Sequence, residues 1–336
     1  MLGAKIPLKK AEAVKKYIMK NDLIVRELWM VRSKDNIIFP VKKEFKNKDV
    51  EFIDYDFKKK EPRKNWKNVL EEKLTKKEFN ILKTSHDIVG SIAILEIPEE
   101  LEKKEKLIAE TLLKFNKNVE TVLKKAGEHE GVFRTQKMQW LAGKKTKETI
   151  HKENNVKIKV DVEKVFFTSR LSTERKRIMQ QIKKGEKVLV MFSGCSPYVC
   201  VFAKNTEAEK VIGVELNKEG HKYAVENIKI NKLNNAEAIQ GDVRKVNPKF
   251  KEKFDRISMQ LPKTADEFLP EAFMVAKKGT IVHFYDFQYE SDFENTKKKI
   301  KKEADRAKLK IKFLDFVKCG QISPSKYRVC QDFRII

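Results

Sequence analysis

Three short apolar runs in the C-terminal half of the sequence each end in residues that could bind a nucleoside. A glycine turn follows the first run and a carboxylate follows each of the next two, and these residues are Gly194, Glu215 and Asp242. Because ligands of parallel α/β sheets lie outside the carboxyl ends of the strands, the three residues would meet at one site. A carboxylate there can hold both ribose hydroxyls, and Gly194 permits a tight turn with close backbone approach to a ligand.

The turn after the first run is not a dinucleotide-binding fingerprint. Ser196 stands where the pattern GxGxxG requires its second glycine, while Pro197 suits the first turn of a helix. A single glycine makes a weak pyrophosphate cradle, which disfavours NAD. An adenosine that carries a small amino-acid tail fits better.

A regular alternation of apolar runs and helical stretches is expected to position these residues. The predicted strands are 187–192, 210–216, 236–240, 255–259, 280–285, 311–316 and 327–333. Helices are predicted at 197–204, 218–232, 265–276 and 291–307, with His221, Val225 and Ile228 on the apolar face of the second. This rhythm is typical of a mainly parallel sheet covered on both faces, and two final strands without a helix between them indicate an antiparallel edge.

Two smaller α+β domains are predicted before this sheet. Residues 1–62 contain a helical stretch at 11–21 and strand-like runs at 28–31 and 36–40, and Pro62 suggests a linker. Within residues 63–158 the predicted elements are a strand pair at 87–97, a helix at 99–116 and strands at 121–124 and 156–162. The third domain, residues 159–336, is the expected catalytic domain.

Composition indicates a polyanionic partner. Lys and Arg number 74 against 49 Asp and Glu, so the net charge is 74 − 49 = +25, and nucleic acid is the first candidate, although many lysines must lie on solvated helix faces. The four cysteines lack paired metal-ligand spacing and are predicted to be buried thiols in a reducing cytoplasm, with no metal site. Neither a signal peptide nor a membrane span is expected.

Several segments carry a resemblance to a known family. They are IHKEN at 150–154, VEKVFFTSRLSTER at 162–175, MFSG at 191–194, IGVELN at 212–217, GDVR at 241–244 and LPK at 261–263. In this order the chain resembles the archaeal tRNA (guanine(37)-N(1))-methyltransferases over nearly its full length. The resemblance implies a small N-terminal module, a middle RNA-contacting domain and a Rossmann-like class I methyltransferase domain.

The same resemblance implies roles for individual residues. Those expected to bind S-adenosylmethionine are Phe192, Gly194, Glu215, Asp242 and Val243. The expected catalytic residues are Glu174 as general base, Arg134 and Gln260, with Gln260 contacting guanine. The residues expected near the target base or steadying the loop or RNA are Phe166, Arg170, Arg175 and Pro262.

The chemistry explains why such residue types are needed. Guanine N1 carries a proton at neutral pH, so a carboxylate such as Glu174 must take it as the methyl group arrives. Negative charge then grows on O6, where Arg134 could stabilise it. Non-catalytic roles are also compatible with the sequence. Glu174 could be a charge that stabilises a helix N-terminus, and Arg170 and Arg175 could make ordinary phosphate contacts. Phe166 could be a core residue.

Other functions are compatible with the sequence. A wyosine-pathway relative would transfer the aminocarboxypropyl group of the same cofactor to the same tRNA position, and a dual-function methyltransferase would also act on a wyosine intermediate. Val190, Ser196 and Gln260 depart from the family pattern, which motivates a third reading as a catalytically inactive tRNA-binding protein. In each case the expected partner is tRNA, and a monomer is expected to bind it through the two smaller domains.

Overall fold

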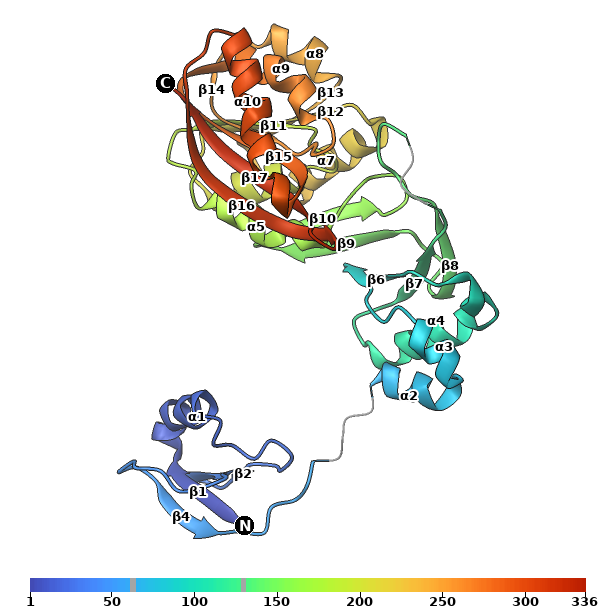
Figure 1. Cartoon of the computed structure of the whole chain (residues 1–336), viewed down its shortest axis with the longest axis vertical. Helices are drawn as coiled ribbons and strands as arrows, with labels where there is room; N and C mark the ends of the chain where they lie inside the picture. The colour runs from blue at the N-terminus through green and yellow to red at the C-terminus, as the bar shows by residue number, and fades with distance from the viewer. Residues whose placement is uncertain (61–64, 128–130) are drawn as a thin grey trace. The chain divides into compact units, whose positions relative to one another are not determined.

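The computed structural model describes residues 1–60, 65–127 and 131–336. The chain divides into two compact units, Met1–Val69 and Leu70–Ile336 (Figure 1). The linker expected at Pro62 lies outside the described residues. The division into three domains at 62 and 158 therefore stays a prediction.

The N-terminal unit is a four-stranded antiparallel sheet with one helix packed on it. Its strands, in the spatial order β2-β3-β1-β4, are β1 (Leu2–Pro7), β2 (Val31–Arg32), β3 (Asn36–Pro40) and β4 (Glu51–Asp54). Helix α1 (Ala11–Lys20), as predicted, buries Val14 and Ile18 against the sheet. The strand predicted at 28–31 is wrong in its bounds. Only β2, at Val31–Arg32, is a strand here, and Leu28 forms an isolated bridge with Lys59.

The first part of the second unit is a four-stranded sheet with a helix on it. Its strands are β5 (Asp87–Val89), β6 (Ile92–Leu95), β7 (Thr121–Lys125) and β8 (Met138–Gly143), in that order. Helix α2 (Trp66–Lys73) contains the boundary between the two units, and the other helices of this part are α3 (Lys76–Ile81), the 3-10 turn Glu99–Lys104 and α4 (Glu105–Phe115). The strand pair around Gly90 is confirmed, and the stretch expected as one helix at 99–116 begins as a 3-10 turn. A hairpin of β9 (Glu148–Glu153) and β10 (Val156–Asp161) follows.

The C-terminal part is a seven-stranded sheet in the order β13-β12-β11-β14-β15-β17-β16. Its strands are β11 (Lys187–Met191), β12 (Lys210–Glu215), β13 (Ala236–Gln240), β14 (Phe254–Met259), β15 (Ala276–Tyr289), β16 (Ile311–Ser323) and β17 (Lys326–Ile335). The first five are parallel, and β17 and β16 form the antiparallel edge, so the predicted Rossmann-like fold is confirmed.

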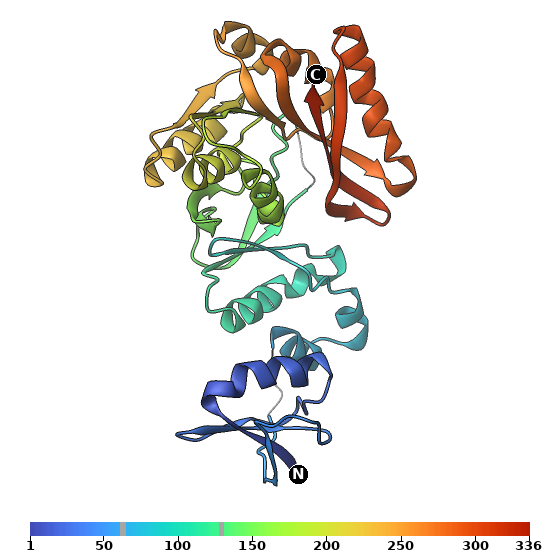
Figure 2. The same cartoon turned by 90° about the vertical axis from the view of Figure 1, so that its left-hand side faces the viewer.

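Helices cover both faces of this sheet because the residues of each strand alternate between two cores. Val188 and Val190 of β11 join one core with helix α6 (Pro197–Asn205), while Leu189 and Met191 join the other. The remaining helices are α5 (Ser172–Met179), α7 (Lys218–Ile230), α8 (Val243–Val246), α9 (Leu269–Met274) and α10 (Glu294–Arg306). Helices α9 and α10 pack on the second face (Figures 1 and 2).

Two predictions about burial need correction. Helix α7 turns Tyr223, Ala224 and Asn227 inward and leaves Val225 exposed, because the Asn227 amide bonds the backbone of Lys159 in β10. Among the cysteines, Cys319 is only half-buried, while the other three are buried. No helix in the described part of the chain is long and apolar enough to cross a membrane.

Candidate functional site

A cavity of about 450 Å³ lies at the carboxyl ends of the parallel strands. All five residues predicted to bind the cofactor line it, and they are Phe192, Gly194, Glu215, Asp242 and Val243. They lie at or just after the carboxyl ends of β11, β12 and β13, which are neighbours in the sheet. The prediction that strand-end residues converge is therefore confirmed as geometry.

The turn after β11 is built from left-handed backbone. Phe192, Gly194 and Ser196 have φ values of 62°, 56° and 61°, and Ser196 is the N-cap of α6. A non-glycine residue in this region costs on the order of 1 kcal/mol or more, and such strain often accompanies ligand sites. This conformation gives the physical reason why a glycine would be favoured at Ser196.

Close packing also fixes this turn from below. A Cβ added to Gly213 of β12 would lie 2.8 Å from the Ser193 hydroxyl oxygen and 2.8 Å from a methyl carbon of Val199. The Ser193 backbone amide donates to the Val214 carbonyl oxygen at 2.9 Å. Gly213 therefore lets the turn sit directly against the neighbouring strand.

The two strand-end carboxylates are held differently. Glu215 accepts hydrogen bonds from the backbone amides of Gly194 at 2.5 Å and Asn217 at 2.7 Å. Burial raises the pKa of Glu215 despite these bonds. The Arg244 guanidinium donates to Asp242 at 2.7 Å and lowers the pKa of that carboxyl. Glu215 thus connects two turns of the cavity wall, and Asp242 stands ionised at its edge.

The other end of the cavity is aromatic and cationic. Phe166, Pro262 and Arg134 line it, and the Arg134 guanidinium lies over the Phe166 ring at 5.2 Å and the Phe287 ring at 5.5 Å. Burial lowers the pKa of Arg134, and the positive charge of Arg328 adds to this effect. Phe166 is thus a wall of the cavity rather than a residue of the closed core.

Arg328 of β17 is a cavity residue that the sequence reasoning missed. Its guanidinium lies 5.4 Å from the centre of the Phe287 ring, on the same cavity as Arg134. Burial lowers its pKa as well. The only sequence signal was the alternation of polar residues Arg328, Cys330 and Asp332 along one face of the last strand.

Gln260 lines the cavity, but its amide is engaged by the protein. With its oxygen accepting from the Ser258 hydroxyl, its nitrogen donates to the Met191 carbonyl oxygen at 2.9 Å. The nitrogen is thus engaged by the protein, while the amide oxygen keeps a second lone pair that can accept a hydrogen bond from a guanine N–H group. The structure therefore places Gln260 at the cavity, and its contact with guanine stays a prediction.

Glu174 is buried behind the cavity wall rather than in it. Arg177 of the same helix holds its carboxylate through two hydrogen bonds of 2.8 Å, and the Tyr285 hydroxyl donates to Oε1 at 2.7 Å. Tyr285 lines the cavity and accepts a hydrogen bond from the Tyr198 hydroxyl at 3.3 Å. Although Glu174 stands in the first turn of α5, its side chain is 5% exposed and is not a solvated helix-end charge.

Arg170 and Arg175 have different surroundings. Arg175 is 1% exposed and forms a two-point pair with Glu153 of β9, and it also donates to the Thr168 carbonyl oxygen at 3.1 Å. It therefore steadies the loop, and the reading as a surface phosphate contact is wrong for it. Arg170 is exposed, bonds Asp87 of β5 at 2.7 Å and lies outside the cavity lining.

The site combines two chemical environments in one space. Carboxylates at the strand ends can accept hydrogen bonds from sugar hydroxyls and an exocyclic amine, while apolar side chains of Phe192 and Val243 can cover a base. At the other end, Phe166 can stack a second base beside the guanidinium of Arg134. Such a site suits group transfer between a nucleoside cofactor and a nucleobase.

Comparison with known proteins identifies the class. Residues 149–312 match the model of the TRM5/TYW2 methyltransferase domain, and residues 66–146 match that of the TYW2 N-terminal domain. The chain is 35% identical over 336 residues to the tRNA (guanine(37)-N(1))-methyltransferase Trm5b of Pyrococcus abyssi, with 99% of each chain covered. This protein belongs to the TRM5/TYW2 methyltransferase family.

Solved structures agree with this assignment. The crystal structure of Trm5b from Pyrococcus abyssi matches with a TM-score of 0.77, covering 100% of this chain and 99% of that one. The complex of aTrm5 and tRNALeu matches with a TM-score of 0.72 at 28% identity and full coverage of both chains. TYW2 of Pyrococcus horikoshii in complex with MeSAdo matches with a TM-score of 0.68 at 27% identity, covering 81% of this chain and 98% of that one.

Proposed function

We propose that this protein transfers the methyl group of S-adenosylmethionine to N1 of guanosine 37 in tRNA. The observation that carries the proposal is the single cavity that joins a nucleoside-binding end at Glu215 and Asp242 to an aromatic and cationic end at Phe166 and Arg134. The full-length similarity to Trm5b supports the same reaction. The net charge of +25 suits a tRNA substrate, and we expect a monomer to bind it.

The residues present fit S-adenosylmethionine. Glu215 would accept the ribose hydroxyls, Asp242 would accept from the adenine amine, and Phe192 and Val243 would cover the adenine faces. When bound, the cofactor supplies an electrophilic methyl group on a sulfonium sulfur. The turn at Gly194 would bring backbone amides close to the cofactor tail.

Glu174 would receive the proton of guanine N1. Because Glu174 lies behind Tyr285, the proton would pass to the Tyr285 oxygen as the Tyr285 hydroxyl proton moves to Glu174 Oε1, 2.7 Å away. Burial raises the pKa of Tyr285, so no free tyrosinate is expected and both protons move together. The N1 lone pair freed in this way would be available to attack the methyl group that the bound cofactor would present, with the electron pair of the carbon–sulfur bond left on the departing sulfur.

The two cavity arginines would stabilise the charge that grows on guanine O6. Arg134 and Arg328 both lie on the ring of Phe287, and their lowered pKa values reflect burial in this part of the site. A guanidinium that meets the oxygen only as it becomes negative lowers the transition-state energy more than that of the ground state. Stacking on Phe166 would hold the base in place.

Aminocarboxypropyl transfer is a second candidate, because residues 66–146 match the TYW2 N-terminal domain. The two reactions leave different atoms of the cofactor on the tRNA. The test incubates the protein with a tRNA transcript bearing G37, in parallel with cofactor labelled in the methyl group and cofactor labelled in the carboxyl group.

Label from the methyl group alone supports the proposal. Label from the carboxyl group alone supports aminocarboxypropyl transfer and refutes methyl transfer. Tight tRNA binding with neither label supports the inactive tRNA-binding protein. A transcript that carries a wyosine intermediate at position 37, methylated in a parallel reaction, would reveal a dual-function enzyme.

A further inference from the structure

A chain of polar side chains, all buried except the partly exposed Arg177, runs across the sheet and ends at Glu174. Its members, contributed by β14, β15, β17 and α5, are Arg256, His283, Asp332, Arg177 and Glu174. Arg177 is the link, because its guanidinium contacts two carboxylates. Besides its two bonds to Glu174, it donates to Asp332 from Nη1 at 2.6 Å and from Nη2 at 3.2 Å.

The far end of the chain fixes Asp332. His283 is fully buried, and its Nδ1 lies 2.6 Å from Asp332 Oδ1 while its Nε2 lies 2.8 Å from Arg256 Nη1. Since Arg256 can only donate, Nε2 must accept, and the ring proton is on Nδ1, directed at Asp332. Burial lowers the pKa of His283, which agrees with a neutral ring. Glu186 pairs with Arg256 at 2.8 Å and balances its charge.

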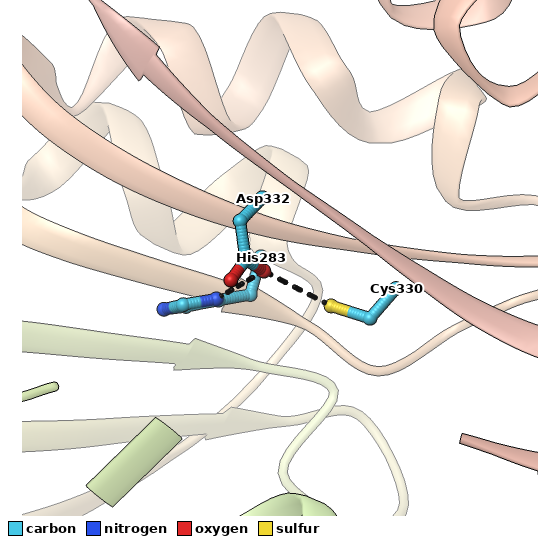
Figure 3. Close-up of side chains that lie close together, drawn as sticks. All are labelled: His283, Cys330 and Asp332. Atoms are coloured by element: carbon cyan, nitrogen blue, oxygen red, sulfur yellow. Dashed lines mark hydrogen bonds and ion pairs between the residues drawn. The ribbon is translucent and has the colours of Figure 1, made fainter. Parts of the chain in front are cut away.

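His283, Cys330 and Asp332 have the ligand types of a metal site, with ligand atoms within 4.8 Å of one another. Figure 3 shows the Asp332 carboxylate between the His283 ring and the Cys330 sulfur. The His283 Nδ1 lone pair is nevertheless replaced by a proton, and two guanidiniums, those of Arg177 and Arg256, contact this group. A metal cation would face both positive charges, so the cluster does not fit a metal.

The charges of the chain bear directly on Glu174. Burial alone would raise the pKa of Asp332, but the contacts from His283 and Arg177 outweigh it and hold that pKa well below its usual value. With Asp332 ionised, the triad of Glu174, Arg177 and Asp332 carries one net negative charge. A proton that arrives at Glu174 makes the triad neutral, which burial favours.

We propose that Asp332 is a positioning residue for the proton acceptor: by sharing Arg177 with Glu174, it fixes the Glu174 carboxylate and keeps it able to take a proton. The inference rests on the proposed function, in which Glu174 receives the N1 proton. Without the charge of Asp332, protonation of Glu174 would leave Arg177 as a partly buried cation with no carboxylate beside it. Glu174 would then be a weaker proton acceptor.

Other titratable groups face Glu174 from the elements packed around it. Besides Arg177 of its own helix and Asp332 of β17, they are Tyr285 of β15, Tyr198 of α6 and Cys330 of β17, with Cys319 of β16 beyond them. Burial raises the pKa of the Tyr198 hydroxyl, and it likewise holds the pKa values of Tyr285 and Cys330 well above their usual values. Tyr198, Tyr285 and Cys330 are therefore neutral over the assay range, so within this group Arg177 and Asp332 carry the charges that act on Glu174.

The test is the pH profile of single-turnover methyl transfer by Asp332→Asn, with the full chain and a G37 transcript. We expect the plateau rate to fall about tenfold and the acidic limb to move to lower pH by about one unit, the usual size for the loss of one neighbouring charge. Affinities for cofactor and tRNA should change by less than about twofold. Asp332→Glu, which restores the charge, should recover part of the rate.

Asp286→Asn is the matched control. Asp286 of β15 is equally buried but bonds Thr296 at 3.0 Å and Lys299 at 3.1 Å instead of Arg177. Its loss removes one buried negative charge without a contact to Glu174. The pH profile of this variant should match that of the wild type.

One outcome is an active wild type and a folded Asp332→Asn variant that keeps the wild-type acidic limb and plateau rate. That result overturns the inference about Asp332 and leaves the proposed function standing. A wild type that transfers no methyl group at any pH refutes the proposed function and this inference with it. Should Asp332→Asn fail to fold, Arg177→Gln replaces it. Removal of the shared cation should move the acidic limb to higher pH, and an unmoved limb overturns the inference.

Discussion

The ion pair between Glu153 and Arg175 is predicted to be the most costly single pair to break around the cavity. The two side chains are 5% and 2% exposed, and they join the hairpin strand β9 to the first turn of α5. Arg175 also bonds the Thr168 carbonyl oxygen and lies 5.5 Å from the centre of the Tyr198 ring. Glu153→Gln keeps the shape of the side chain and removes its charge.

The magnitude follows from burial. Removal of one partner of a buried pair costs about 3–5 kcal/mol, because the remaining charge is left without compensation. Glutamine retains one acceptor oxygen for Arg175, so we expect the lower end, about 3 kcal/mol. With an unfolding entropy of about 2.1 cal/mol/K per residue, that loss lowers the Tm of a 336-residue chain by roughly 4–5 °C.

The assay compares thermal unfolding of Glu153→Gln with that of Asp87→Asn. Asp87 pairs with the exposed Arg170, and its loss should cost only about 0–1 kcal/mol. Equal Tm values for the two variants would refute the reasoning that burial determines the cost.

The pH dependence of the same pair gives a second check. Burial alone would raise the pKa of Glu153, but the hydrogen bonds from His151 and Arg175 hold it below its usual value of 4.5. A carboxyl with a depressed folded-state pKa stabilises the protein fully above 4.5, and this contribution is lost as the pH falls through the lowered value. The Tm difference between wild type and Glu153→Gln should therefore shrink below about pH 4.5, and a constant difference would contradict the assignment.

Three further substitutions test the cavity. In Gly213→Ala, the added methyl group should displace Ser193 and the turn after β11 and destabilise the protein by about 1–3 kcal/mol. Cofactor binding measured by calorimetry should weaken, and an unchanged affinity would show that the turn shifts without cost to the site. Tyr285→Phe removes the hydroxyl bonded to Glu174 and should slow single-turnover transfer about tenfold or more with the cofactor affinity retained, whereas a wild-type rate would exclude the proton path. Arg328→Gln should lower kcat/KM by roughly 100-fold, and a loss confined to KM would indicate ground-state binding instead.

The sheet and the cofactor end of the cavity could be predicted because their signals are local. Apolar runs such as 187–192 alternate with helical stretches, and this rhythm leaves few arrangements other than a parallel sheet. In such a sheet the carboxyl ends of the strands share one edge. Glu215 and Asp242 could therefore be placed together from their positions in the sequence alone.

Strands whose sequences lack a strand pattern were missed. Strand β1 includes Gly3 and Pro7, and β8 ends in Gly143, so neither has the alternation of apolar and polar residues that marks a strand. Both are strands because of their neighbours, β1 between β3 and β4 and β8 beside β7. Tertiary pairing overrides local propensity in such cases.

The catalytic end depends on long-range register and on side-chain direction. His283 and Asp332 are 49 residues apart in the sequence and become partners only because β15 pairs antiparallel with β17. No motif marks them, nor does one mark Arg328. The position of Glu174 behind Tyr285 follows from the direction of its side chain, which the segment RLSTER at 170–175 does not reveal.

The most direct test of the central claim is the identity of the nucleoside made at position 37. The protein would be incubated with S-adenosylmethionine and a tRNA transcript bearing G37, and the digested product would be analysed by mass spectrometry beside a transcript bearing A37. We expect 1-methylguanosine from the first transcript and no methylated nucleoside from the second. An aminocarboxypropyl product, methylation of both transcripts, or no product from a transcript that binds would contradict the claim.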